Sequence, residues 1–173
     1  METAMDFPTT ATITAIATII RNLIPCLLAV SCQSSPPSWK VSETKSRHPS
    51  YQACSISQKP DNLYRGMELE FVRTSSRTHA YLNVFSLTFP SDRLDENKTK
   101  VVIKIEDEEQ IFLAHRLEGG QRLLLPEDAR DLLVQALLEN KPVAMIAGRF
   151  DVKISPGNFS KKHCQKINLY EKR

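Results

Sequence analysis

The chain has 173 residues, of which 25% are charged and 41% are hydrophobic. This balance is typical of a folded globular protein and argues against a disordered chain or a multi-pass membrane protein. Ten prolines against five glycines exclude collagen-like and glycine-rich classes, and a formal net charge of +3 is too small to predict nucleic-acid binding.

The N-terminal segment is the most apolar part of the chain, because residues 9–31 contain only one charge, Arg21. Beyond Cys32 the sequence becomes polar and rich in serine and proline. This order is typical of a targeting segment followed by a tether, so we predict a signal segment over residues 1–31 and a flexible tether over 32–50. Trp39, the single tryptophan, is then expected to be a surface or interface residue.

The junction Ala29-Val30-Ser31-Cys32, preceded by two leucines, resembles the lipobox of bacterial lipoproteins. The resemblance implies that a signal peptidase cuts before Cys32, and that the Cys32 thiol and the new amino group then carry acyl chains such as palmitate. It also implies that the protein is located at the outer membrane, because the residue after the cysteine is Gln33 and not an aspartate. Otherwise the chain resembles only small uncharacterised lipoproteins of Gram-negative bacteria.

Two other interpretations of the N-terminal segment stay open. One is an ordinary secretory signal that is cleaved. The other is an uncleaved single span, because residues 11–31 are long enough to cross a bilayer. Arg21 would then lie near the middle of the span and cost about 2.5–3.5 kcal/mol on insertion scales.

The two remaining cysteines outside the signal segment, Cys54 and Cys164, lie near opposite ends of residues 51–173. An exported protein meets an oxidising compartment, so we predict a disulfide between them, the alternative being two unrelated thiols. In the chain-entropy model such a long loop contributes on the order of 4–5 kcal/mol. A metal site is not expected, because no further cysteine or close histidine pair completes a tetrahedral ligand set.

Residues 51–173 are predicted to form a single β-rich domain, because apolar residues recur with a period of two along most of this region. Gly119-Gly120 is a typical hairpin turn between two such segments. The predicted strands cover residues 67–71, 81–89, 101–105, 111–117, 122–125, 143–154 and 159–169.

One amphipathic helix is predicted over residues 126–140. Pro126 and the acidic pair after it suit the start of a helix, and Asn140 and Pro142 suit its end. Its apolar stripe consists of Ala129, Leu132, Leu133, Ala136 and Leu137. The predicted fold is therefore mainly β with one helix (α+β), an antiparallel sheet or sandwich of about six or seven strands, because a single helix cannot supply several parallel crossovers.

Catalytic motifs are missing from the sequence: it has no G-x-S-x-G elbow, no H-E-x-x-H and no phosphate loop. We therefore expect no catalysis and no cofactor. The alternative is an envelope hydrolase with a histidine-centred site, for which His79 and His115 are the candidate bases.

The expected function is that of a lipid-anchored envelope protein acting as a binding, assembly or structural module. Its expected partners are membrane lipid, through acylated Cys32, and an unidentified envelope protein. The basic C-terminal region, with Lys161, Lys162 and Lys166, is a candidate contact for an anionic surface, the alternative being a solvated tail or a strand edge guarded by lysine.

Overall fold

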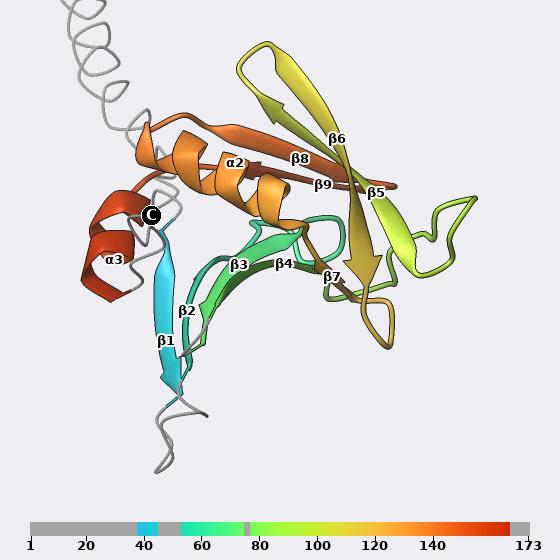
Figure 1. The fold of residues 1–173 in the computed structure, drawn as a ribbon, viewed down its shortest axis with the longest axis horizontal. Helices are drawn as coiled ribbons and strands as arrows, with labels where there is room; N and C mark the ends of the chain where they lie inside the picture. The colour runs from blue at the N-terminus through green and yellow to red at the C-terminus, as the bar shows by residue number, and fades with distance from the viewer. Residues whose placement is uncertain (1–37, 45–52, 75–76, 167–173) are drawn as a thin grey trace, which may run out of the picture. The chain divides into compact units, whose positions relative to one another are not determined.

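A single antiparallel sheet of nine strands forms most of the structure, a computed structural model that describes residues 38–44, 53–74 and 77–166 (Figure 1). The described residues fall within one compact unit. The spatial order of the strands is β1-β2-β3-β4-β7-β6-β5-β8-β9. The strands are β1 (Lys40–Thr44), β2 (Ala53–Gln58), β3 (Glu68–Arg73), β4 (Thr78–Asn83), β5 (Lys98–Ile105), β6 (Glu108–Arg116), β7 (Arg122–Leu124), β8 (Val143–Ala147) and β9 (Phe150–Ile154).

The sheet bends around a helix, α2 (Glu127–Leu138), which packs between β4 on one half of the sheet and β8 on the other (Figure 1). We call the face of the sheet toward α2 the inner face and the opposite one the outer face. Apolar side chains of the strands alternate onto the inner face, where they meet the buried side of the helix. The buried residues of α2 are Ala129, Leu133, Val134, Ala136 and Leu137.

Helix α2 confirms the helix predicted over residues 126–140. Pro126, in an extended conformation with φ −65° and ψ 161°, immediately precedes the first helical residue. Glu127 and Asp128 lie in the first turn, where carboxylates complement the positive end of the helix dipole. Asn140 has a positive φ of 60°, a conformation that ends helices and that asparagine tolerates better than most residues.

The two edge strands of the sheet, β1 and β9, are bridged by the segment that follows β9. The Trp39 indole donates a hydrogen bond from Nε1 to the carbonyl oxygen of Ser155 at 3.0 Å, and its backbone N–H donates to Oδ1 of Asn158 at 2.9 Å. The Ser155 N–H donates to Oε1 of Gln58, in β2, at 3.0 Å. These bonds join parts of the chain about a hundred residues apart and hold the open sheet in its curved form.

Trp39 is a core residue, so the expectation of a surface position is wrong. Its side chain is 2% exposed, with its ring centroid 4.7 Å from that of Phe159 and 6.0 Å from that of Phe71. The next residues, Lys40–Thr44, lie within the predicted tether but form strand β1 and pair with β2. The polar composition of this strand fits an edge with most side chains in solvent, which is why its sequence looks like a linker.

The prediction of a mainly β, antiparallel α+β fold is confirmed, but the count of six or seven strands is wrong because the sheet has nine. Residues 143–154 form a hairpin instead of one strand, since Gly148 takes a positive φ of 63° and turns the chain after β8. Strands β1 and β2 were not recognised because few of their residues are apolar. The strands also form one open sheet and not a sandwich.

The strand predicted over residues 159–169 is wrong as well, because Phe159–Lys166 is a second helix, α3. Phe159 and His163 are both buried and lie one helical turn apart, with ring centroids 5.5 Å from each other. Alternation with a period of two would have placed both on one face of a strand equally well, so the sequence pattern alone was ambiguous here. The packing of Phe159 against Trp39 and Phe71 favours the helix.

Burial of His163 predicts a loss of stability in acid. Desolvation lowers the pKa of this imidazole below its ordinary value of 6.5. His163 therefore binds a proton more weakly in the folded protein than in the unfolded chain. The free energy of unfolding should therefore fall as the pH drops through about 6.5 and below. Urea titrations at about pH 8 and about pH 5.5 measure the free energy of unfolding, and its fall between the two pH values should be smaller for His163→Gln than for the unmodified chain. An equal fall in both proteins would contradict this role of His163.

Candidate functional site

The outer face of the sheet carries two different surfaces. Over β3, β4 and β7 lies a polar cluster, and over β5, β6 and β8 lies an apolar stripe. The polar cluster consists of Glu68, Glu70, Tyr81, Asn83 and Arg122. The apolar stripe consists of Val102, Ile111, Leu113 and Ile146.

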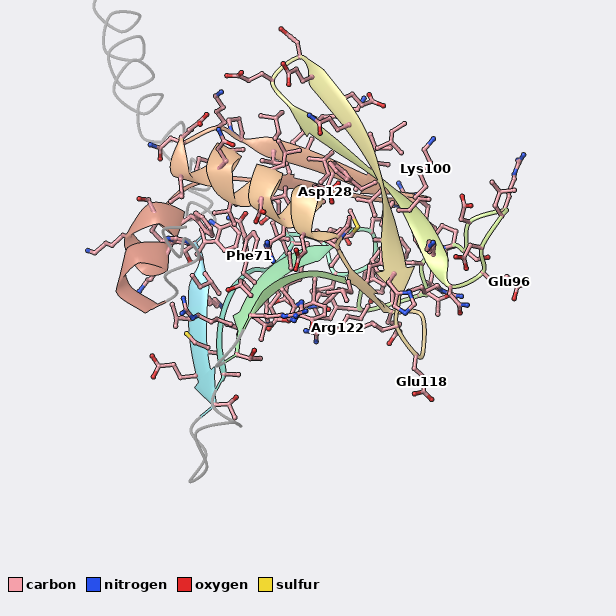
Figure 2. All side chains as sticks on the ribbon, viewed as in Figure 1. Phe71, Glu96, Lys100, Glu118, Arg122 and Asp128 are labelled. Atoms are coloured by element: carbon pink, nitrogen blue, oxygen red, sulfur yellow. The ribbon has the colours of Figure 1, made fainter. Side chains whose placement is uncertain are left out.

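The polar cluster is a network of mutually satisfied side chains. The Arg122 guanidinium donates from Nη2 to Oε2 of Glu70 at 3.0 Å and lies 4.0 Å from the centre of the Tyr81 ring. Asn83 donates from Nδ2 to Oε2 of Glu68 and to Oε2 of Glu70, each at 3.3 Å. Figure 2 shows Arg122 on the outer side of the sheet and Phe71 on the side of the helices. Because its charges already have partners, this cluster is better suited to stabilising the sheet than to holding a ligand.

The apolar stripe has the opposite character, since its side chains face solvent. Val102 on β5 is opposite Ile111 on one side and Ile146 on the other, and Leu113 follows on the same face. The exposed fractions are 55% for Ile111, 51% for Leu113 and 36% for Ile146. Val102 between them is half-buried. A row of exposed and half-buried aliphatic side chains across three strands is typical of an interaction surface.

A groove adjoins the stripe where residues 90–94 pass over β5 and β8. The groove has a volume of about 640 Å³ and reaches Val102, Ile146 and Gly148. Its loop is held to β5 because the Thr99 hydroxyl donates to the carbonyl oxygen of Pro90 at 2.7 Å. Leu94, in the same loop, is 96% exposed. The groove therefore extends the apolar surface and gives it a defined shape.

Basic side chains border the stripe. Lys104 forms an ion pair with Glu109 at 2.6 Å, and Lys98 forms one with Asp95 at 3.2 Å. The pKa of Asp95 is held below its ordinary value, first by a hydrogen bond from the Asn97 N–H and then by Lys98. Lys100 points outward beside Leu113 (Figure 2) and forms no ion pair within the described residues. The border therefore carries Lys100 on one side, beside Leu113, and Asp151 on the other, opposite Ile146.

The two candidate histidine bases both lie on the outer face but not together. His115 on β6 lies opposite Leu124 on β7, which in turn lies opposite Tyr81 on β4. His79 lies on β4, two residues before Tyr81, so strand β7 lies between the two histidines. The His79 ring is 6.2 Å from the ring of Tyr81. Over residues 38–44, 53–74 and 77–166, no hydrogen bond pairs either imidazole with a carboxylate or a hydroxyl, and no three ligating side chains could hold a metal ion.

The predicted disulfide is only partly covered by the described residues. Cys54 lies on β2, partly buried against the core, and α3, which contains Cys164, packs against β2. The Cys164 side chain lies outside the described residues, so the disulfide stays a prediction. The lipidation residue Cys32 also lies outside them.

The lysines proposed for an anionic surface belong to a helix and not to a strand edge or a tail. On α3, Lys161 is exposed and Lys162 is partly exposed. The side chain of Lys166 lies outside the described residues. Within the described ranges, neither helix is long and apolar enough to cross a membrane.

The apolar stripe was missed by sequence reasoning because the alternation along residues 111–117 does not show which face of β6 is buried. In the structure Phe112 and Ala114 face the core, and Ile111 and Leu113 lie on the outer face. One signal was present: Val101-Val102-Ile103 is apolar without alternation, a pattern that predicts cover on both faces of a strand.

Comparison with known proteins found no relative of this chain: no family model, no curated protein and no solved structure matches it.

Proposed function

We propose that this protein is a lipid-anchored binding and assembly module of the bacterial cell envelope, and that the apolar stripe is the surface on which a partner protein docks. The resemblance of Ala29-Val30-Ser31-Cys32 to a lipobox supports the anchor. The exposure of Ile111, Leu113 and Ile146 supports the docking surface.

The row of exposed aliphatic side chains is the observation that carries the docking function. Each Å² of apolar surface removed from water contributes about 25 cal/mol, so covering side chains of this size is strongly favourable. The apolar stripe and the adjoining groove fit a partner with exposed apolar side chains. Because Lys100 borders the stripe without an ion pair in the described residues, an acidic flank on the partner would add charge complementarity.

The anchor determines where such docking takes place. Acyl chains on Cys32 would hold the module at the outer membrane, since each buried CH₂ contributes roughly 0.8 kcal/mol and more than one chain gives stable attachment. The segment between Cys32 and the first described residues would then join the module to the bilayer. Lys161, which is exposed, and Lys162, which is partly exposed, are suited to anionic headgroups near that surface.

Metabolic labelling with a palmitate analogue tests the anchor. We expect the full-length chain to incorporate the label and Cys32→Ala to lose it, because that change removes the thiol that accepts the diacylglycerol. Cys26→Ala is the matched control and should keep the label, since Cys26 lies within the predicted signal segment. A Cys32→Ala protein that is labelled as strongly as the unmodified chain would overturn the proposal.

A further inference from the structure

A slot lies along the free edge of β9, where the segment after β2 passes close to it. We propose that this slot, called the edge slot below, binds a small zwitterion, such as a short peptide with a free ammonium and a free carboxylate group. It has a volume of about 430 Å³, within the range of ordinary ligand pockets. The side chains on which the argument rests are Gln58, Lys59, Asp61, Arg65, Asp151 and Lys153.

One wall of the edge slot is a tightly wound turn. The Gly66 N–H donates to the carbonyl oxygen of Asn62 at 2.8 Å, and the Tyr64 N–H donates to Oδ1 of the same residue at 2.8 Å. A Cβ atom at Gly66 would collide with the ring of Pro60 and with the Asn62 carbonyl, so only glycine fits there. The Asp151 N–H, which donates to the carbonyl oxygen of Arg65 at 3.3 Å, ties this turn to β9. The slot is therefore formed before any ligand arrives.

Hydrogen-bond donors without partners face or border the edge slot. Along the free edge of a strand, alternate residues direct both N–H and C=O away from the neighbouring strand. Along β9 and the residue after it, these positions are Asp151, Lys153 and Ser155. The Asp151 N–H donates to the Arg65 carbonyl oxygen, and the Ser155 N–H donates to the Gln58 side chain. For the N–H of Lys153, which lies between them, no partner is found in the described part of the chain.

Gln58 supplies a second donor. Its side chain is only 3% exposed, and its Oε1 is held by the Ser155 N–H, so the orientation of the amide is defined. Its Nε2 has no hydrogen-bond partner among the described residues, and a buried donor without a partner is destabilising. An acceptor group that enters the slot, such as a carboxylate, would satisfy Gln58 and the Lys153 backbone together.

Charges of both signs surround these donors. Lys59, Arg65 and Lys153 are positive, Asp61 and Asp151 are negative, and all five residues line the slot. Among the described residues none of the five forms an ion pair. Unpaired groups of both signs in one slot are suited to a ligand that carries both charges, with its carboxylate at the cations and its ammonium at the aspartates.

The edge slot and the apolar stripe share no residue, but they adjoin, because Asp151 of the slot lies opposite Ile146 of the stripe. Different measurements test them: ligand binding tests the slot, and docking of a partner protein tests the stripe.

Calorimetric titration of the full chain with triglycine, acetate and ethylammonium tests the proposal. We expect triglycine to bind with a dissociation constant in about the millimolar range and each single-charge probe to bind at least about tenfold more weakly. Asp151→Asn and Lys153→Gln should each weaken triglycine binding by about fivefold. The matched controls Asp107→Asn, in the β5–β6 turn, and Lys98→Gln, on β5, remove the same charges away from the slot and should bind as the unmodified chain does.

Two outcomes would overturn the proposal: no saturable heat with triglycine, or acetate binding as tightly as triglycine, which would indicate an anion site only. Thermal unfolding of every variant checks that it is folded. If Lys153→Gln is not folded, Lys59→Gln provides the same test from the opposite wall, and unchanged triglycine binding in that variant and in Asp151→Asn would equally contradict the proposal.

Discussion

Replacing Trp39 with alanine should lower the free energy of unfolding by about 3–5 kcal/mol. The indole is 2% exposed and packs against Phe71 and Phe159, so its removal leaves a cavity where β1 meets α3. It also removes the hydrogen bond from Nε1 to the Ser155 carbonyl, which connects the two ends of the sheet. Urea unfolding followed by circular dichroism measures the change.

Two further substitutions show which part of the effect is due to packing. Trp39→Phe keeps an aromatic ring but leaves the Ser155 carbonyl without its donor, so it should cost about 1–3 kcal/mol. Lys40→Ala changes the exposed neighbour on β1 and should stay within about 0.5 kcal/mol of the unmodified chain. If Trp39→Ala were as mild as Lys40→Ala, the segment before β2 would not belong to the core.

Replacing Leu113 with aspartate should abolish docking of the partner while leaving the fold intact. Leu113 is 51% exposed and belongs to the apolar stripe, and a charge there would have to be buried against apolar side chains of the partner. Loss of one contact of this kind costs about 2 kcal/mol or more, which is roughly a thirtyfold loss of affinity. Stability should change little because the side chain contributes to no buried packing.

A photo-crosslinking residue at position 100 in the full-length, membrane-attached chain measures this docking. Lys100 borders the stripe, and Glu118 at the tip of the β6–β7 turn is the control position away from it (Figure 2). We expect one defined protein adduct from position 100, none from position 118, and loss of the adduct when Leu113→Asp is added.

Leu63→Asp is the matched control for this experiment, because Leu63 is 52% exposed but lies outside the stripe. It should leave the adduct from position 100 unchanged. The docking function would be contradicted by an adduct that survives Leu113→Asp, or by one that Leu63→Asp removes equally.

Local patterns were sufficient to predict much of the central sheet. Val101, Ile103 and Ile105 alternate inward on β5 as expected, and α2 begins and ends close to its predicted bounds because proline, carboxylates and asparagine act on the nearest backbone groups. The turn at Gly119-Gly120 was also predictable, since both residues take a positive φ that glycine adopts without strain.

The candidate surfaces could be predicted only in part. Which of the two faces of β6 is buried depends on the position of α2, and the alternation of Ile111 to Leu117 is compatible with either. The edge slot could not be predicted at all, because Gln58 and Lys153 are about a hundred residues apart and meet only when the sheet bends.

The N-terminal resemblance to a lipobox, the β-rich class and helix α2 follow from the amino-acid sequence alone, because each depends on residues within a few positions of one another. Only the tertiary structure decided that Trp39 is core, that polar Lys40–Thr44 is a strand and that Phe159–Lys166 is a helix. The physical reason is that these segments are stabilised by one another, through hydrogen bonds and ring contacts between distant residues, and no local pattern encodes such contacts.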